Sequence, residues 1–136
     1  MALKMQFLLK NKNMETNTSD FNWHDCPLYS LKFDDNLELD LDYIIKWELG
    51  DNNKYKYLIA PAILVFYEVK NFHISAKSSI LNGFEINYIK KDPQNSWKID
   101  LQEGEIIFES EGFTQKLTKK PIWSDNQYLS EKERMI

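Results

Sequence analysis

The chain has 136 residues, a formal net charge of −4 and one arginine among its 17 basic residues. This length is typical of one domain, and a hydrophobic share of 43% excludes an intrinsically disordered chain. The acidic balance and the shortage of arginine argue against nucleic-acid binding, and no apolar run is long enough to predict a membrane span. The lone Cys26 indicates a reducing, cytoplasmic location. We expect residues 1–20 to be a flexible lead-in and residues 21–136 to be one β-rich domain.

The first predicted elements are a short strand over residues 28–33 and a long strand over residues 37–47, joined by a turn at residues 34–36. Along the long strand, apolar side chains alternate with polar ones, which is the pattern of a half-buried strand. Its apolar face is predicted to carry Leu37, Leu39, Leu41, Tyr43, Ile45 and Trp47.

Two further strands are predicted over residues 54–59 and 63–69. Between them lies Pro61, which cannot donate a hydrogen bond to a sheet, so we expect a bulge or a switch between sheets there. The second of these strands is apolar on both faces and must be covered on both sides. We expect the C-terminal segment to provide that cover. Shorter strands follow at residues 72–76 and 84–91.

Residues 97–118 predict a three-stranded antiparallel meander with two-residue turns at Glu103-Gly104 and Glu111-Gly112. In this register Lys98 lies opposite Glu109, and both turn glycines supply a positive φ. The side chains expected to point inward are Ile99, Leu101, Ile106, Phe108 and Leu117.

The C-terminal residues contain two capping-box patterns, one beginning at Ser124 and one at Ser130. A short helix or turn is therefore expected between Ser124 and Met135, with Trp123, Tyr128 and Leu129 packed onto the sheet. The fold class predicted is mainly β: a single-domain antiparallel sheet, sandwich or open barrel of about eight strands with a short C-terminal helix. The pattern does not choose between sandwich, open barrel and bent sheet.

The stretch Phe21–Tyr29 holds one of the two histidines and the only cysteine. A Cys–His dyad needs hydrogen-bond contact between its members, and residues two apart on a strand usually diverge. No second cysteine completes a zinc set. We therefore interpret Trp23 as a core anchor, Asp25 as a turn residue, and His24 as hydrogen-bonded to backbone.

Glu38, Asp40 and Asp42 lie on the polar face of the long strand. Three carboxylates in a row suit a hard cation, but we expect them to be solvated and to hold no structural metal. Such a row is also a negative surface for a lysine-rich partner. The binding residues predicted are Tyr55, Tyr57, Asp40 and Asp42.

Several segments together carry a resemblance to a known class of protein. They are Trp23-His24-Asp25 before a hairpin, the run of residues 37–47, the segment Ala60–Phe66, and Gln127-x-Leu129 with the late Arg134. The chain resembles small, uncharacterised β-rich bacterial domains of the kind found among immunity proteins of polymorphic toxin systems. The resemblance spans residues 21–134 and rests on structural motifs. It implies a protein that binds and blocks one toxin without catalysis, and no catalytic residue is carried over.

Two functional hypotheses follow. The first is a non-catalytic protein-binding domain, in the form of an immunity-type inhibitor, with a protein partner and no cofactor, nucleic acid or membrane. The second is a small enzyme or ligand-binding protein whose pocket uses His24, Asp25, His73 or the Asp40/Asp42 row. A meeting of His24 and His73 beside a carboxylate would favour the second hypothesis. Oligomeric state is left open.

Overall fold

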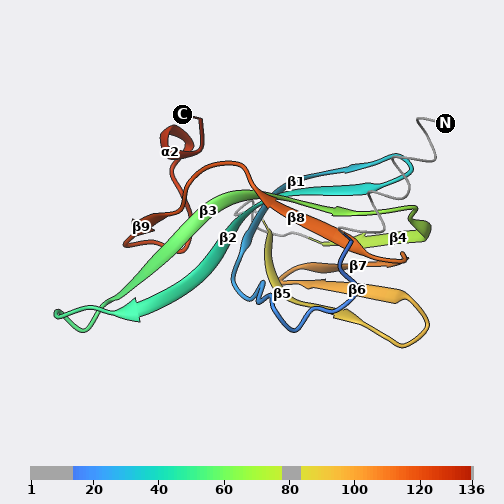
Figure 1. Ribbon diagram of the computed structural model, residues 1–136, viewed down its shortest axis with the longest axis horizontal. Coiled ribbons are helices and arrows are strands. Elements are labelled where there is room, and N and C mark those ends of the chain that lie inside the picture. The colour runs from blue at the N-terminus through green and yellow to red at the C-terminus, as the bar shows by residue number, and fades with distance from the viewer. Residues whose placement is uncertain (1–13, 78–83, 136) are drawn as a thin grey trace.

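The structure, a computed structural model, describes residues 14–77 and 84–135 (Figure 1). The described part contains nine strands and one short helix. They are β1 (Pro27–Phe33), β2 (Leu37–Leu49), β3 (Tyr55–Phe66), β4 (Lys70–Ala76), β5 (Phe84–Lys91), β6 (Ser96–Leu101), β7 (Gly104–Glu109), β8 (Phe113–Leu117), β9 (Ile122–Ser124) and α2 (Glu131–Met135). The predicted fold class, mainly β with a short C-terminal helix, is confirmed.

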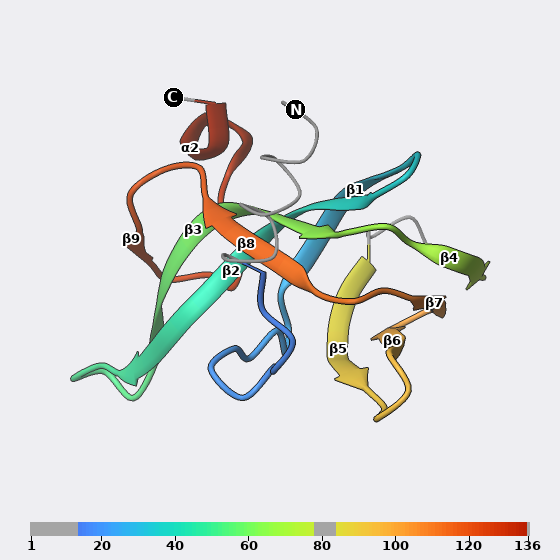
Figure 2. The same cartoon turned by 45° about the vertical axis from the view of Figure 1, so that its right-hand side comes forward.

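The strands form one antiparallel sheet in the order β4-β7-β6-β5-β1-β2-β3-β8, and β9 pairs with β3. The sheet is strongly bent, so that β5, β6, β7 and β4 run at an angle to the long strands β2 and β3 (Figure 2). Strands β4 and β8 are the two ends of this order, and the sheet is open rather than closed into a barrel. Among the described residues, no helix has the length and apolar character needed to cross a membrane.

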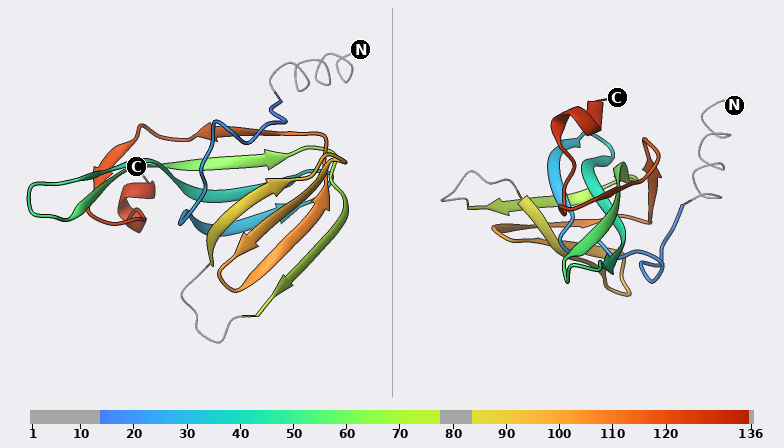
Figure 3. Two further views of the ribbon diagram at one scale, coloured as in Figure 1. Left: turned by 90° about the horizontal axis from the view of Figure 1, so that it is seen from below. Right: turned by 90° about the vertical axis from the view of Figure 1, so that its left-hand side faces the viewer.

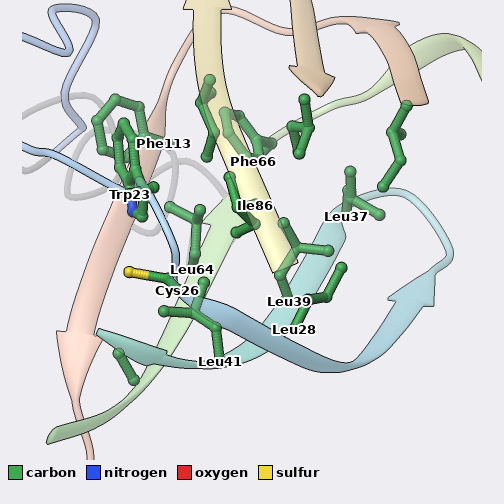
Figure 4. Close-up of a cluster of buried hydrophobic side chains, with 14 of the residues drawn as sticks. Trp23, Cys26, Leu28, Leu37, Leu39, Leu41, Leu64, Phe66, Ile86 and Phe113 are labelled. Carbon is green, nitrogen blue, oxygen red and sulfur yellow. The ribbon is translucent and has the colours of Figure 1, made fainter. Parts of the chain in front are cut away.

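The hydrophobic core lies inside the bend, where the two halves of the sheet face each other (Figure 4). Phe66 of β3 is fully buried and lies 5.0 Å from Trp97 and 4.7 Å from Phe108, measured between ring centroids. Phe113 of β8 completes this cluster at 5.7 Å from both Phe66 and Trp97. Aromatic pairs with this edge-to-face or tilted geometry add stabilisation beyond the area that they bury.

The predicted meander over residues 97–118 is wrong in its connectivity. Strand β7 pairs with β4, and β8 leaves β7 to pair with β3. Where the chain passes from β7 to β8, the hydroxyl of Ser110 donates a hydrogen bond to the carbonyl of Tyr67 at 2.7 Å. Pairing with β3 places Phe113 directly opposite Phe66, inside the core. Leu117, predicted to point inward, is 38% exposed at the far end of β8.

The β6–β7 hairpin has the predicted faces but a different register. Ile99 pairs with Ile106 and Leu101 with Gly104, a shift of two residues that leaves every side chain on the same face. Lys98 consequently forms its ion pair with Glu105 at 3.6 Å rather than with Glu109. Neither turn glycine adopts a positive φ; at Gly104 a Cβ would lie only 2.3 Å from the carbonyl oxygen of Ser75. Glycine is needed there for the close approach of β4.

Pro61 does not interrupt its strand, because β3 continues through it. Along the edge opposite β2, β3 pairs with β9 through residues 57–59 and with β8 through residues 62–66. Pro61 lies between these two partners, where the loss of an N–H is tolerated. The bulge falls on the neighbouring strand at Ile45, where the β2–β3 register shifts between Ile44 and Lys46. A bulge reverses the faces of the residues that follow it.

The C-terminal segment packs on the outer face of the sheet, beside Pro61 rather than over residues 63–69 (Figure 3). The capping box at Ser130 is confirmed: its hydroxyl accepts from the N–H of Glu133 at 3.1 Å, and the Glu133 carboxylate accepts from the N–H of Ser130 at 2.8 Å. Leu129 is buried as predicted, whereas Trp123 and Tyr128 are about half exposed. The pattern at Ser124 caps no helix and ends β9 instead.

The predicted lead-in divides into two parts. Residues 1–13 lie outside the described residues. Glu15 forms an isolated bridge with Phe113, with hydrogen bonds of 2.7 and 2.8 Å in the two directions. The chain here lies so close to Gly112 that a Cβ at that glycine would meet the side chain of Met14 at 2.5 Å.

Candidate functional site

The stretch before β1 turns sharply and separates its polar residues from its apolar ones. The N–H of Cys26 donates to the carbonyl of Trp23, and the N–H of Asp25 donates to the carbonyl of Ile86 at 2.8 Å. Asp25 takes a positive φ of 66°, a conformation that aspartate tolerates better than most residues. Trp23 and Cys26 are therefore buried, while His24 and Asp25 face outward.

Cys26 is not placed to act with His24. Its side chain is fully buried among leucines (Figure 4), and its sulfur accepts a hydrogen bond from the N–H of Ile44 at 3.5 Å. Burial raises the pKa of the thiol to about 12, so that the reactive thiolate is scarce at neutral pH. His24 instead hydrogen-bonds to the backbone carbonyl of Asn87, at 3.1 Å.

We expect Cys26 to resist Ellman's reagent in the folded protein at pH 8 and to react fully after unfolding in urea. The folded rate should be slower by roughly two orders of magnitude or more, because the thiol is both enclosed and protonated. Since the folded pKa is the higher one, this group stabilises the fold below about pH 9 and loses that contribution as the pH rises toward 12. Rapid labelling of the native protein would contradict this assignment.

A pocket of about 240 Å³ lies beside this turn, along the β2–β3 hairpin. It is lined by His24, Asp25, Ile44, Trp47, Tyr55 and Tyr57. Two of these, Trp47 and Tyr57, are direct cross-strand partners. We call this group of six residues the aromatic pocket.

The bulge at Ile45 explains why Trp47 lines the aromatic pocket. Strict alternation along β2 places Trp47 on the face of Leu39 and Leu41, which is the core face. After the bulge it shares a face with Ile44 instead. The sequence-based assignment of Trp47 to the apolar core face is therefore wrong, and its side chain is 48% exposed.

Negative charge collects at one side of the aromatic pocket. The carboxylate of Asp25 lies 3.4 Å from Nε2 of His24 and accepts a hydrogen bond from the amide of Gln127 at 3.3 Å. Burial raises the pKa of nearby Glu85, and the charge of Asp25 raises it further. Burial is the largest cause of this raised pKa, and the smaller effect of the Asp25 charge is opposed by His24.

The Asp40/Asp42 row has a different role from the one predicted. Asp42 is completely buried and accepts hydrogen bonds from the Tyr29 hydroxyl at 2.5 Å and from the N–H of Leu129 at 2.8 Å. Arg134 of α2 pairs with Asp42 and, at 2.5 Å, with Asp40. Its guanidinium also lies over the Tyr29 ring, 4.0 Å from the centroid. The expectation of a solvated side chain is wrong for Asp42, whereas Glu38 and Asp40 are partly exposed. Asp40 and Asp42 together hold the C-terminal helix to the sheet.

The structure unites some of the predicted site residues and separates others. Tyr55 and Tyr57, predicted as binding residues, share a pocket with His24 and Asp25, which belonged to the alternative hypothesis. His73 lies on β4 at one end of the sheet, paired with Ile107, and does not line that pocket. Within residues 14–77 and 84–135, no group of three or more His, Cys, Asp or Glu side chains could hold a metal ion.

Sequence reasoning missed three members of this neighbourhood: Ile44, Trp47 and Glu85. The bulge at Ile45 explains only Trp47, and no residue type in β2 predicts that bulge. Ile44 precedes the bulge, and Glu85 lies on β5.

Comparison with known proteins gave no match: no family model, curated protein or solved structure matches the chain.

Proposed function

We propose that this chain is a non-catalytic protein-binding domain whose partner docks on the β2–β3 hairpin. The observation that carries the proposal is the exposure of large apolar side chains around the aromatic pocket. Trp47, Leu49 and Tyr55 are 48%, 58% and 51% exposed, and Leu49 pairs directly with Tyr55. Exposed apolar clusters on soluble domains mark interaction surfaces, and tryptophan and tyrosine dominate binding hot spots.

The position of the hairpin supports docking. Its tip projects away from the body of the domain, so that a partner can reach it without obstruction (Figure 1). Cross-strand contacts hold the aromatic residues in place, which lowers the entropy lost on binding. The separation of Cys26 and His73 from the aromatic pocket also favours binding over catalysis, because these groups cannot act together there.

The specific form that we propose is an immunity protein, which binds a bacterial toxin in the cytoplasm and blocks it. The net charge of −4 suits a basic partner. Residues Tyr55 and Tyr57 are the proposed contacts, joined now by Trp47. Asp40 and Asp42 are not proposed as contacts, because they are engaged with Arg134.

The proposal is tested by affinity purification from the source organism with three baits: the native protein, the double variant Trp47→Ala/Tyr55→Ala, and Trp123→Ala. Trp123 is a matched control, since it is 46% exposed and pairs with Leu58, which points to the opposite face of β3 from Tyr57. We expect one partner to be retained by the native and Trp123 baits and lost by the double variant. Loss of at least about 100-fold in affinity is the scale of a central hot spot.

If the chain is an immunity protein, its partner must be toxic. The partner expressed alone in bacteria should arrest growth. Co-expression of the native protein should restore growth, and co-expression of the double variant should not. A partner that binds all three baits equally, or a turnover that depends on His24, would move the enzyme hypothesis to first place.

A further inference from the structure

We propose that the aromatic pocket receives a lysine or arginine side chain of the partner, held between the rings of Trp47, Tyr55 and Tyr57 and the carboxylate of Asp25. This inference rests on the protein-binding function proposed above and names the chemistry that the partner must present. The rings would enclose the charged group, and the Asp25 carboxylate would neutralise its charge.

The size and lining of the aromatic pocket suit one side chain. At about 240 Å³ it is below the range of roughly 300–1,000 Å³ typical of cofactor and small-molecule sites. Three of its six lining residues are tryptophan or tyrosine, and Ile44 supplies an aliphatic wall. Rings of this kind attract a cation through the negative potential of their faces, and the attraction is strongest for tryptophan. The aliphatic stem of a lysine or arginine would pack against Ile44.

Among the described residues that line the aromatic pocket, none is a lysine or an arginine. A backbone carbonyl can only accept a hydrogen bond, so the contact between His24 and Asn87 places a proton on Nδ1 of the imidazole. In the neutral ring, Nε2 is then an acceptor, and it faces the Asp25 carboxylate at 3.4 Å. When the imidazole is neutral, two acceptors lie side by side, with Glu85 nearby. An incoming ammonium or guanidinium group can donate to both.

Surroundings of the aromatic pocket favour a cation carried by a protein. The pocket opens on the hairpin face where Leu49 and Tyr55 are more than half exposed. A free amine would fill the pocket and leave this apolar surface in water. A protein that inserts a basic side chain would bury the surrounding apolar surface as well, and burial of apolar area is favourable.

The test is a titration of the ¹⁵N-labelled protein, followed by NMR, with three capped tripeptides: Gly-Lys-Gly, Gly-Arg-Gly and the uncharged isostere Gly-norleucine-Gly. We expect the lysine and arginine peptides to shift the indole N–H of Trp47 and the amides of His24 and Asp25 saturably. Binding of the norleucine peptide should be at least tenfold weaker. Tetramethylammonium chloride, run in parallel, reports what the bare cation contributes without a peptide.

Two variants and one control complete the design. Trp47→Ala removes the best ring, and Asp25→Asn removes the charge while keeping a residue that accepts a positive φ. Each should weaken binding of the lysine peptide tenfold or more, whereas Trp123→Ala should leave it unchanged. Equal binding of the norleucine and lysine peptides, or no shift at pocket resonances with any peptide, would overturn the inference. If the partner is nevertheless released by Trp47→Ala/Tyr55→Ala, the docking surface stands and only the cation assignment falls.

Discussion

Replacement of Arg134 by alanine is expected to lower the free energy of unfolding by about 3 kcal/mol, because it leaves a carboxylate buried without its cation. Asp42 is fully buried on a central strand and cannot move to solvent, while Arg134 belongs to the terminal helix α2. The Tyr29 hydroxyl and the N–H of Leu129 still donate to Asp42, but neither supplies a positive charge. The melting temperature should fall by roughly 10 °C for a domain of this size.

Thermal denaturation followed by circular dichroism measures this effect. Lys132→Ala, on the exposed side of the same helix, is the control and should change stability by less than about 0.5 kcal/mol. Asp42→Asn should cost less than Arg134→Ala, because the arginine keeps its pair with the partly exposed Asp40 and no buried charge is left without a partner. The double variant Asp42→Asn/Arg134→Met should recover part of the loss, since a neutral pair leaves no buried charge. An Arg134→Ala melting curve that matches that of Lys132→Ala would show that the pair is not formed.

Replacement of Trp23 by alanine should cost about 3–5 kcal/mol, which is the usual range for a large aromatic side chain lost from a core. Trp23 is 2% exposed, stacks on Phe21 at 5.2 Å and meets Phe113 edge-on at 5.6 Å. Its indole N–H donates to the side-chain oxygen of Gln115 at 2.7 Å. The variant therefore loses both packing and a partly buried hydrogen bond.

Urea denaturation distinguishes these two contributions. Trp23→Phe retains an aromatic ring but not the N–H, so it should be destabilised by less than the alanine variant. Trp123→Ala, which removes the same side chain from an exposed site, should lie within about 1 kcal/mol of the native protein. A Trp23→Ala midpoint close to that of Trp123→Ala would show that the indole does not anchor the N-terminal segment to β8.

The sequence by itself determined most of the strands, several of their inward faces and the cap of the short helix. Alternation over residues 37–41 places three leucines in the core, and each of them is fully buried. The faces of β6 and β7 were also correct, since a register shift of two residues leaves them unchanged. The capping box at Ser130 was predicted from four residues, because both of its hydrogen bonds are local. Such features depend on side-chain spacing along one segment.

Tertiary structure decided the partners and the role of each polar residue. The alternating pattern of β8 would fit beside either β7 or β3. Pairing with β3 places Phe113 beside Phe66 in the core. Asp42 is a second example. Whether the polar face of β2 is solvated or covered depends on Arg134, which is distant in the sequence and pairs with Asp42 in the fold. Four of the six members of the aromatic pocket were named from the sequence, in two separate hypotheses. Strict alternation assigned Trp47 to the core. The bulge at Ile45 reverses the faces of the residues that follow it, and this bulge is visible only in the pairing with β3.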